Sequence, residues 1–296
     1  MGDVAWIAVD WGTSHLRAWL MDARGQVMER RQSDDGMGGL DRAGFEPALR
    51  ALVGDALDAP VLACGMVGSR QGWAEAPYAT VPCAPPGAAE AVRVAGIDLD
   101  VRILPGVKQL KPADVMRGEE TQIAGFMATH PEFDGVIALP GTHTKWVHVS
   151  AGEIVSFRTA MTGEMFGLFS KHSVLRHSMG AGWDDDAFAD GVDQAMSRPE
   201  GLAAALFSLR AESLLNDLPG NQARARLSGL LIGAELAAMR PYWLGQAVAL
   251  VGADALVTAY ATALQAQAVP VQKAAAEAMT LAGLTAAYTQ LQGEAA

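Results

Sequence analysis

Two short segments of the chain place glycine and hydroxyl residues between apolar runs. The first, DWGTS at residues 10–14, begins with a carboxylate, and the second, PGTHTK at residues 140–145, ends with a lysine. Glycine allows backbone N–H groups to approach an anion closely, and hydroxyl groups are additional donors. Each segment therefore has the composition of a turn that binds phosphate oxygens. The candidate residues are Gly12, Thr13, Ser14, Gly141, Thr142, Thr144 and Lys145.

The charged residues of the two turns extend this chemistry. Asp10 is a candidate ligand for Mg²⁺, directly or through water, because Mg²⁺ binds few protein carboxylates and keeps several waters. Lys145 offers a point charge to a phosphate. Two such turns across a cleft would hold a nucleoside triphosphate from both sides, whereas the alternative is a pair of ordinary hairpins. The chain has neither a Walker A sequence nor a GxGxxG sequence after a strand.

The two turns occupy corresponding places in an internal repeat. In each copy an apolar strand leads into the turn, a second strand follows it, and a polar turn with glycine leads to a third strand. These strands are predicted at 4–9, 15–21 and 26–32 in the first copy and at 135–140, 146–150 and 153–159 in the second. The pattern predicts a duplicated α/β domain with a hairpin at the start of each half.

The remaining segments alternate between strands and helices. Residues 65–87 are rich in glycine and proline and are expected to form loops, as is the segment that begins at Lys111, whereas residues 162–240 are mostly helical. The sequence predicts strands at 60–64, 101–104 and 270–272, a strand, glycine turn and helix over 247–264, and helices at 43–57, at 87–94, from near Gly118 and at 274–291.

Composition limits the classes of function. The chain has 296 residues, which favours two domains, and 33 acidic against 22 basic residues give a net charge of −11. This charge argues against nucleic acid as a partner, since nucleic-acid binding needs a basic surface. No signal peptide is visible, and polar and glycine residues interrupt the apolar stretch at 241–272, so no membrane span is expected. Cys64 and Cys83 fit two reduced thiols of a cytoplasmic protein.

Five segments of the chain resemble one enzyme family. DWGTSHLRAW, GMVGSRQGW, RGEETQ, LPGTHTKW and FRTAMTGEMF together resemble the 2-dehydro-3-deoxygalactonokinase family of the actin, hexokinase and Hsp70 superfamily. The resemblance implies an α/β fold with two ribonuclease H-like (actin-like ATPase) domains, a central cleft and a helical insertion in the second domain. We place the domains at 1–116 and 117–296. The implied activity is phosphorylation of the 6-hydroxyl of a sugar acid, 2-dehydro-3-deoxy-D-galactonate, with ATP and Mg²⁺.

Phosphoryl transfer needs a group that orients the acceptor hydroxyl. The resemblance places this group at the start of the helix that links the two halves, where Glu119 and Glu120 are the candidates. Consecutive helical side chains point about 100° apart, so only one is expected to face the cleft. Glu119 is favoured. The alternative is that both carboxylates only stabilise the helix N-terminus.

The substrate and nucleoside contacts follow from the resemblance and from the chemistry of a sugar acid. Arginine is the natural partner of a carboxylate, and related sugar kinases contact their substrate through the loop at 65–73. The candidates for substrate binding are Arg17, Ser69, Arg70, Gln71, Trp73 and Arg158. Gly252, between a strand and a helix, corresponds to the place where superfamily members contact adenosine.

Two other functions are compatible with the same fold. One is an exopolyphosphatase-like hydrolase that activates water, but its substrate needs a basic channel, which a chain of net charge −11 does not favour. The other is a non-enzymatic nucleotide switch, which has no need of the polar loop at 65–73. The partner of the favoured kinase is a small sugar acid, and the helical region at 165–240 could support a homodimer.

Overall fold

The computed structural model describes residues 3–56 and 58–294. The chain groups into two compact units, each with its own main sheet. The first unit comprises residues 1–134, 149–156 and 276–296, and the second comprises residues 135–148 and 157–275. The predicted boundary between residues 116 and 117 lies inside the first unit, which also includes the last helix of the chain.

The main sheet of the first unit contains the predicted hairpin strands. Its strands are β1 (Trp6–Trp11), β2 (Leu16–Met21), β3 (Val27–Ser33), β4 (Val61–Gly65), β6 (Val92–Arg93) and β7 (Val101–Ile103). Their order is β3-β2-β1-β4-β7-β6. β1, β4 and β7 are parallel, and the other strands run antiparallel to their neighbours.

Both faces of this sheet are covered, which explains why its central strands are continuous apolar runs. Ile7 of β1 packs on the face covered by helix α1 (Phe45–Val53). Trp6 points to the opposite face, where it packs in a cluster with Leu284 of the last helix, α9 (Ala276–Glu294). The first strand is therefore buried between an early helix and the final helix of the chain.

The segment from residue 78 to residue 116 differs from the prediction. Strands β5 (Tyr78–Thr80), β8 (Gly106–Leu110) and β9 (Ala113–Met116) form a small sheet in the order β5-β8-β9. The predicted helix at 87–94 is wrong, because residues 88–90 form a single 3-10 turn and β6 then pairs with β7. Strands as short as these cannot be separated from loops by their periodicity alone.

The five-stranded sheet repeats the topology of the main sheet of the first unit. Most of it lies in the second unit, although residues 149–156 of its two hairpin strands group with the first unit. Its strands are β10 (Gly135–Leu139), β11 (Thr144–Ser150), β12 (Glu153–Ala160), β13 (Val248–Gly252) and β14 (Val271–Ala275). Their order, β12-β11-β10-β13-β14, corresponds to β3-β2-β1-β4-β7 in the first unit. β10, β13 and β14 are parallel, as are β1, β4 and β7. The predicted duplication is confirmed at the level of topology.

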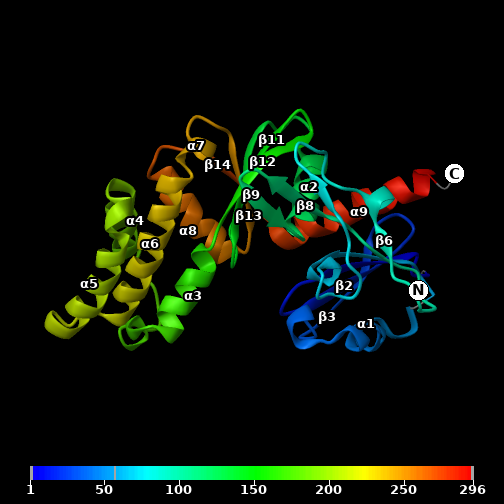
Figure 1. The fold of residues 1–296 in the computed structure, drawn as a ribbon, viewed down its shortest axis with the longest axis horizontal. Coiled ribbons are helices and arrows are strands. Elements are labelled where there is room, and N and C mark those ends of the chain that lie inside the picture. Colours follow the sequence, from blue (N-terminus) through cyan, green and yellow to red (C-terminus); the bar gives the residue numbers. More distant parts are fainter. Residues whose placement is uncertain (1–2, 57, 295–296) are drawn as a thin grey trace. The chain divides into compact units, whose positions relative to one another are not determined.

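The predicted helical insertion lies between β12 and β13. It consists of α3 (Thr162–His172), α4 (Asp185–Ser197), α5 (Leu202–Leu215), α6 (Gly220–Ala238) and α7 (Arg240–Trp243), and α8 (Asp254–Gln265) follows β13. Helix α6 contacts both α4 and α5, and the three helices form one group in Figure 1. Across the described ranges, no helix is both long enough and apolar enough to cross a membrane.

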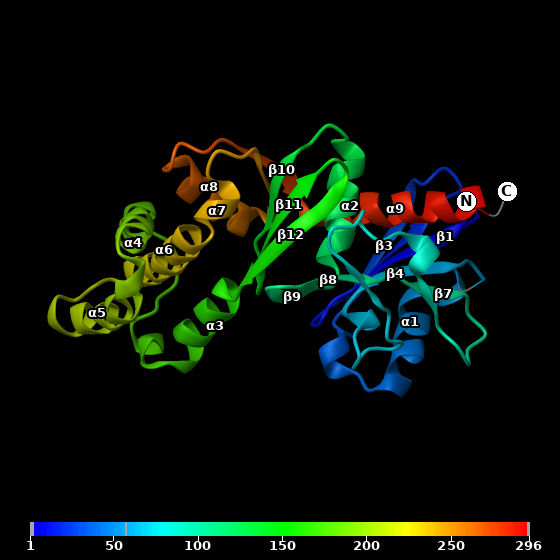
Figure 2. The same ribbon diagram turned by 45° about the horizontal axis from the view of Figure 1, so that its top comes forward.

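Helix α2 (Glu119–Thr129) lies beside α9 in the first unit (Figures 1 and 2). Two glycines allow this close approach. A Cβ atom at Gly125 would lie 1.9 Å from the carbonyl oxygen of Met279, and one at Gly283 would lie 2.0 Å from that of Thr121. Because α9 also contacts β1 and β4, it fixes α2, with the two candidate glutamates in its first turn, relative to the sheet.

Candidate active site

The first predicted turn, between β1 and β2, is supported by a second segment of the chain. The backbone N–H of Met37 donates to the carbonyl of Gly12 (3.0 Å). A Cβ atom at Gly36 would lie 2.3 Å from the carbonyl carbon of Ser14, so only glycine fits at that position. Thr13 and Ser14 are exposed. The segment at Gly36 and Met37 therefore supports the turn, while the hydroxyl residues of the turn face solvent.

Asp10 and Arg17 are paired at the base of this turn. They are opposite one another in the β1–β2 register, and Nη1 of Arg17 donates to Oδ2 of Asp10 (3.0 Å). Burial raises the pKa of Asp10, the guanidinium of Arg17 opposes this shift, and the charges of Glu277 and Glu119 add to it. Asp10, Arg17 and Glu119 therefore share one electrostatic environment.

The ends of β1 and β4 meet the start of α2. Gly65, the last residue of β4, has a φ angle of +96°, and a Cβ atom there would lie 2.7 Å from the carbonyl oxygen of Trp11. A Cβ atom at Gly118 would lie 3.3 Å from the Cα of Gly65. Ligands of open α/β sheets bind beyond the carboxyl ends of the parallel strands. This contact places the first turn of α2 at that edge.

The two candidate glutamates have different environments. Glu120 is 2% exposed, and the backbone N–H of Gly118 donates to both of its carboxylate oxygens (2.7 and 2.8 Å). Burial, together with the charge of Glu119, raises the pKa of Glu120 to about 7. Glu119 is partly exposed, and its Oε2 accepts the backbone N–H of Arg117 (3.1 Å). Glu119 is therefore the more accessible of the two carboxylates.

We expect Glu120 to make the stability of the protein depend on pH. Its pKa of about 7 in the folded protein exceeds the ordinary value of 4.5. Its contribution to the free energy of unfolding is therefore complete below pH 4.5 and is lost as the pH rises through 7. Relative to the Glu120→Gln variant, the free energy of unfolding of the wild type should fall by about 3 kcal/mol as the pH rises over this range. Denaturant unfolding measures this change.

The control for this measurement is Glu132→Gln, which changes an exposed carboxylate after α2. This control should retain the pH-dependent loss of stability that Glu120 causes. A constant difference between wild type and Glu120→Gln would contradict the expected burial of an ionising group.

The glycine-rich loop after β4 contains interior and surface residues. Ser69 is 5% exposed, and its hydroxyl has no hydrogen-bond partner among the residues that the structure describes. Arg70 is 82% exposed and pairs with Glu75 (3.5 Å), and Gln71 is also exposed. Of the predicted substrate residues in this loop, Ser69 is the one whose polar atom is buried without a partner.

The prediction that Trp73 contacts a substrate finds no support. Trp73 is 7% exposed and belongs to the main core of the first unit. It stacks on Phe45 (centroids 6.1 Å apart) and meets Trp11 edge-on (5.9 Å). Aromatic pairs of this geometry stabilise a core beyond their buried area. Trp73 therefore anchors the loop to the core.

Arg117 is a site residue that the sequence did not single out. Its side chain is 8% exposed, its Nη2 donates to the carbonyl of Ala76 (2.8 Å), and its guanidinium lies 4.2 Å from the centre of the Tyr78 ring. A Cβ atom at Gly68 would lie 2.9 Å from Nη1. The sequence shows that Arg117 precedes the helix of the two glutamates. It does not show that the arginine is buried against a distant loop.

The second turn is supported by the start of α3. A Cβ atom at Gly163 would lie 2.2 Å from the carbonyl oxygen of Gly141, and the backbone N–H of Glu164 donates to the carbonyl of Thr142 (2.9 Å). The Glu164 carboxylate also contacts Nε2 of His143 (2.6 Å). Each predicted turn is thus supported by a second segment of the chain. In each segment a glycine, Gly36 or Gly163, leaves no room for a Cβ atom.

The inner end of the second turn belongs to a buried hydrogen-bond network around Glu235 of α6, another residue that the sequence did not single out. The hydroxyl of Thr144 bonds the hydroxyl of Tyr260 (2.9 Å), which donates to Glu235 (2.8 Å). Nε1 of Trp146 (2.7 Å) and the hydroxyl of Thr162 also donate to this carboxylate. Burial raises the pKa of Glu235, although these donors oppose the shift. The Thr144 hydroxyl is therefore satisfied internally, which argues against its prediction as a phosphate ligand.

The other predicted residues of the second unit lie in three different places. Lys145 is 4% exposed, and its Nζ donates to the carbonyl of His143 (3.5 Å). Gly252 ends β13, and a Cβ atom there would lie 3.3 Å from the carbonyl oxygen of Pro140, just before the second turn. Arg158 is exposed on β12. Gly252 and the second turn are thus neighbours.

A cavity of about 430 Å³ adjoins the second turn within the second unit. Gly141 and Thr142 line it at one end, and apolar side chains of α3, α6 and α8 line much of the rest. The guanidinium of Arg224 lies 5.1 Å from the centre of the Phe166 ring, and both residues line the cavity. A mainly apolar cavity with a few polar groups at one end is typical of a site for an organic ligand.

The donors around the first turn fit a magnesium ion that is bound together with a phosphate. Within the described ranges, no group of three or more His, Cys, Asp or Glu side chains is arranged to hold a metal ion. Mg²⁺ needs no such group, because it is usually held by one or two carboxylates with phosphate oxygens and water. Asp10, with Glu119 in the same electrostatic environment, supplies oxygen ligands of the preferred kind.

Comparison with known proteins identifies the family. The chain matches the 2-keto-3-deoxy-galactonokinase family over residues 10–287. The chain belongs to this family. It is 40% identical over 293 residues to "Probable 2-dehydro-3-deoxygalactonokinase DgoK1" of Rhizobium meliloti, covering 95% of both chains. It is 38% identical over 289 residues to the 2-dehydro-3-deoxygalactonokinase of Escherichia coli, covering 94% of this chain and 96% of the relative.

Solved structures agree with this membership of the 2-keto-3-deoxy-galactonokinase family. The crystal structure of a Sinorhizobium meliloti protein assigned as a 2-dehydro-3-deoxygalactonokinase is 37% identical, with a TM-score of 0.89 over 97% of this chain and 99% of that chain. The activator of the 2-hydroxyisocaproyl-CoA dehydratase from Clostridium difficile, with bound ADPNP, has a TM-score of 0.53 over 98% of this chain and 96% of that chain. At 11% identity, this second likeness shows the fold alone.

In this galactonokinase family member, we expect Gly163→Ala to distort the second turn. The added methyl would lie 2.2 Å from the carbonyl oxygen of Gly141, so backbone must move. Overpacking of this kind costs about 1–3 kcal/mol, and thermal unfolding should show the loss. The matched control is Gly167→Ala in the same helix, where an added Cβ meets nothing within 4 Å. Since alanine favours helix over glycine, the control should be at least as stable as the wild type.

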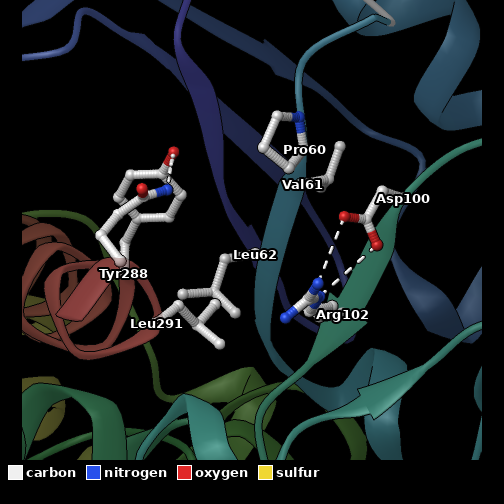
Figure 3. Close-up of a pocket in the computed structure, with 8 residues that line it drawn as sticks. Pro60, Val61, Leu62, Asp100, Arg102, Tyr288 and Leu291 are labelled. Carbon is white, nitrogen blue, oxygen red and sulfur yellow. Dashed lines mark hydrogen bonds and ion pairs between the residues drawn. The ribbon is translucent and has the colours of Figure 1, made fainter. Parts of the chain in front are cut away.

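The first unit of this family member has another cavity, which lies apart from the candidate site. It measures about 170 Å³ and is lined by residues that include Pro60 and Leu62 at the start of β4 and Tyr288 on α9 (Figure 3). Arg102, at its edge, pairs with Asp100 (3.4 Å). The cavity lies near the amino-terminal end of β4, whereas Gly65 and the candidate residues lie at the carboxyl end.

Proposed function

We propose that this chain transfers the γ-phosphoryl group of ATP to the 6-hydroxyl of 2-dehydro-3-deoxy-D-galactonate. The observation that carries the proposal is the 40% identity, over 95% of both chains, to a relative whose name gives this activity. The site adds support, because both glycine and hydroxyl turns of the phosphate-binding pattern are present and are held by dedicated segments.

The first unit supplies the groups that act on the acceptor and on the transferred phosphate. Glu119 orients the acceptor 6-hydroxyl and accepts its proton, as a positioned general base does. Gly12, Thr13 and Ser14 donate to phosphate oxygens through backbone and hydroxyl groups. Asp10 would hold Mg²⁺, which supplies charge neutralisation of the phosphates when bound. Arg17 keeps the Asp10 carboxylate in place through their hydrogen bond.

The second unit supplies the nucleotide site. We assign the nucleoside to the cavity of about 430 Å³ beside the second turn. Gly141, Thr142 and Lys145 would contact the phosphates, and Gly252 permits close approach of the nucleoside because it has no side chain. The buried network around Glu235 holds the turn at its inner end.

The proposed partner is a small sugar acid, and the proposed location is the cytoplasm, where ATP is available to a metabolic kinase.

The homodimer suggested for the helical region at 165–240 stays a prediction. Size-exclusion chromatography with light scattering tests it directly, since a monomer at working concentration would exclude it.

The test of the function is coupled ADP release from the purified protein with ATP and Mg²⁺. The acceptors are 2-dehydro-3-deoxy-D-galactonate, its gluconate epimer, polyphosphate and no acceptor. ADP release that requires the galactonate compound supports the proposal and fixes the preference at C4. ADP release without an acceptor, or phosphate release from polyphosphate, would replace it with a hydrolase. ATP binding without turnover would favour a nucleotide switch.

A further inference from the structure

The charge of Arg117 is only partly compensated by the protein. Its side chain is 8% exposed, and burying a guanidinium is costly unless its charge and its donors are satisfied. Ala76 accepts from Nη2 (2.8 Å), and the Tyr78 hydroxyl accepts weakly from Nε (3.4 Å). Nη1 has no hydrogen-bond partner in the described part of the chain. Burial raises the pKa of the Glu120 carboxyl and the charge of Arg117 acts to lower it, although both oxygens of that carboxylate accept the backbone N–H of Gly118.

A second unsatisfied group belongs to the loop that Arg117 contacts. Nη1 of Arg117 lies against Gly68, where a Cβ atom would be only 2.9 Å away. The next residue, Ser69, is 5% exposed, and its hydroxyl also has no partner within the described residues. Buried polar groups are nearly always hydrogen-bonded, so such exceptions call for an explanation. A polar ligand that both groups contact would explain the two exceptions together.

We propose that Arg117 and Ser69 bind the carboxylate of the sugar acid, and that Arg117 makes the enzyme select acids over neutral sugars. The inference rests on the proposed function and assigns its acceptor specificity. A guanidinium offers two parallel donors that match a carboxylate, and stacking on Tyr78 (4.2 Å) holds its plane in place. The hydroxyl of Ser69 supplies one further donor.

The position of Arg117 connects the two ends of the acceptor. Its backbone N–H donates to Oε2 of Glu119 (3.1 Å), the carboxylate proposed to orient the reacting hydroxyl. The residue that binds the carboxylate end is therefore hydrogen-bonded to the residue that acts at the hydroxyl end. Loss of the carboxylate contact should affect orientation as well as binding, and hence both kcat and KM.

The arginines that the sequence proposed for this role are less suited to it. Arg17 donates to Asp10 (3.0 Å), and Arg70 is 82% exposed and pairs with Glu75 (3.5 Å). Arg158 is exposed on β12. An exposed arginine contributes little to a carboxylate contact, because water screens the charge.

The test compares enzyme variants and acceptors in one matrix. Arg117→Gln and Arg117→Lys are assayed with the sugar acid and with its neutral carboxamide, and KM for ATP is measured in parallel. We expect Arg117→Gln to lower kcat/KM for the acid by about 100-fold or more and to change that for the carboxamide little. Arg117→Lys should recover only part of the loss, since lysine lacks the planar pair of donors. Equal losses for acid and carboxamide would show that Arg117 is only structural and would overturn the proposal.

The control is Arg93→Gln, which removes an arginine that is 69% exposed and pairs with Asp100 in the same unit. It should leave discrimination between acid and carboxamide unchanged. If the wild type phosphorylates no sugar acid at all, the proposed function fails. If the wild type discriminates and Arg117→Gln discriminates equally, this inference alone fails.

A measurement on the wild type covers the case in which Arg117 variants do not fold. The guanidinium ¹⁵N resonances of Arg117 are followed by NMR while a 6-deoxy sugar acid, which cannot be phosphorylated, is added without nucleotide. The acid should shift the Arg117 signals, and the carboxamide should not. Saturating inhibition of turnover by the 6-deoxy acid without any change in these signals would place the carboxylate elsewhere.

Discussion

Glu119→Gln is expected to lower kcat by about 10²- to 10⁴-fold, the range for loss of a general base. The amide is nearly isosteric and still accepts the backbone N–H of Arg117 through its carbonyl oxygen, but it cannot take up the proton of the acceptor hydroxyl. KM for the sugar acid and for ATP should change much less than kcat. Steady-state kinetics with varied acceptor and varied ATP separates the effect on kcat from the effects on the two KM values.

The control for this variant is again Glu132→Gln, an exposed carboxylate beyond the end of α2. It should retain wild-type kinetics. Thermal unfolding confirms that Glu119→Gln is folded. A folded Glu119→Gln protein with wild-type kcat would remove Glu119 from the proposed mechanism and direct attention to Glu120.

Asp10→Asn is expected to lower kcat/KM for ATP by roughly 100-fold or more, because a metal ion contributes several kcal/mol of charge stabilisation. The amide keeps the shape of the side chain and still accepts from Arg17, but it removes the charge that attracts Mg²⁺. The Mg²⁺ concentration needed for half-maximal activity should rise as well. Titration of activity with Mg²⁺ at fixed ATP measures both effects.

Asp34→Asn is the matched control, since Asp34 lies near the same turn, pairs with His15 and has a side chain that is 93% exposed. Its Mg²⁺ dependence should equal that of the wild type. An unchanged Mg²⁺ requirement in Asp10→Asn would show that Asp10 does not contribute to metal binding and serves only as the partner of Arg17.

The sequence predicts the architecture well because the relevant signals are local. Each hairpin is encoded by an apolar strand, a glycine and hydroxyl turn and a second strand, and the same plan occurs at 135–160. The parallel strands β4 and β13 are continuous apolar runs. These features lead to the duplicated sheet order that the structure shows.

The site is predicted less well because its details depend on contacts between distant segments. Trp73 stands in a polar loop, and only packing against Phe45 shows that it belongs to the core. Glu235 is one acidic residue in a long helix until Trp146 and Tyr260 meet it. Arg117 is distinguished by burial against Tyr78, which lies on a strand too short to be recognised from its periodicity.

The return of α9 to the first unit has a consequence for biosynthesis. Residues 135–148 and 157–275, which form the second unit, have all been synthesised before α9 (Ala276–Glu294) is complete. Until then, the face of β1 that carries Trp6 lacks its cover, and α2 lacks the helix beside it. The unit that begins at the N-terminus is thus the last to be finished on the ribosome. A nascent chain arrested before residue 276 should expose this apolar face to chaperones, although the residues of the second unit are already in place.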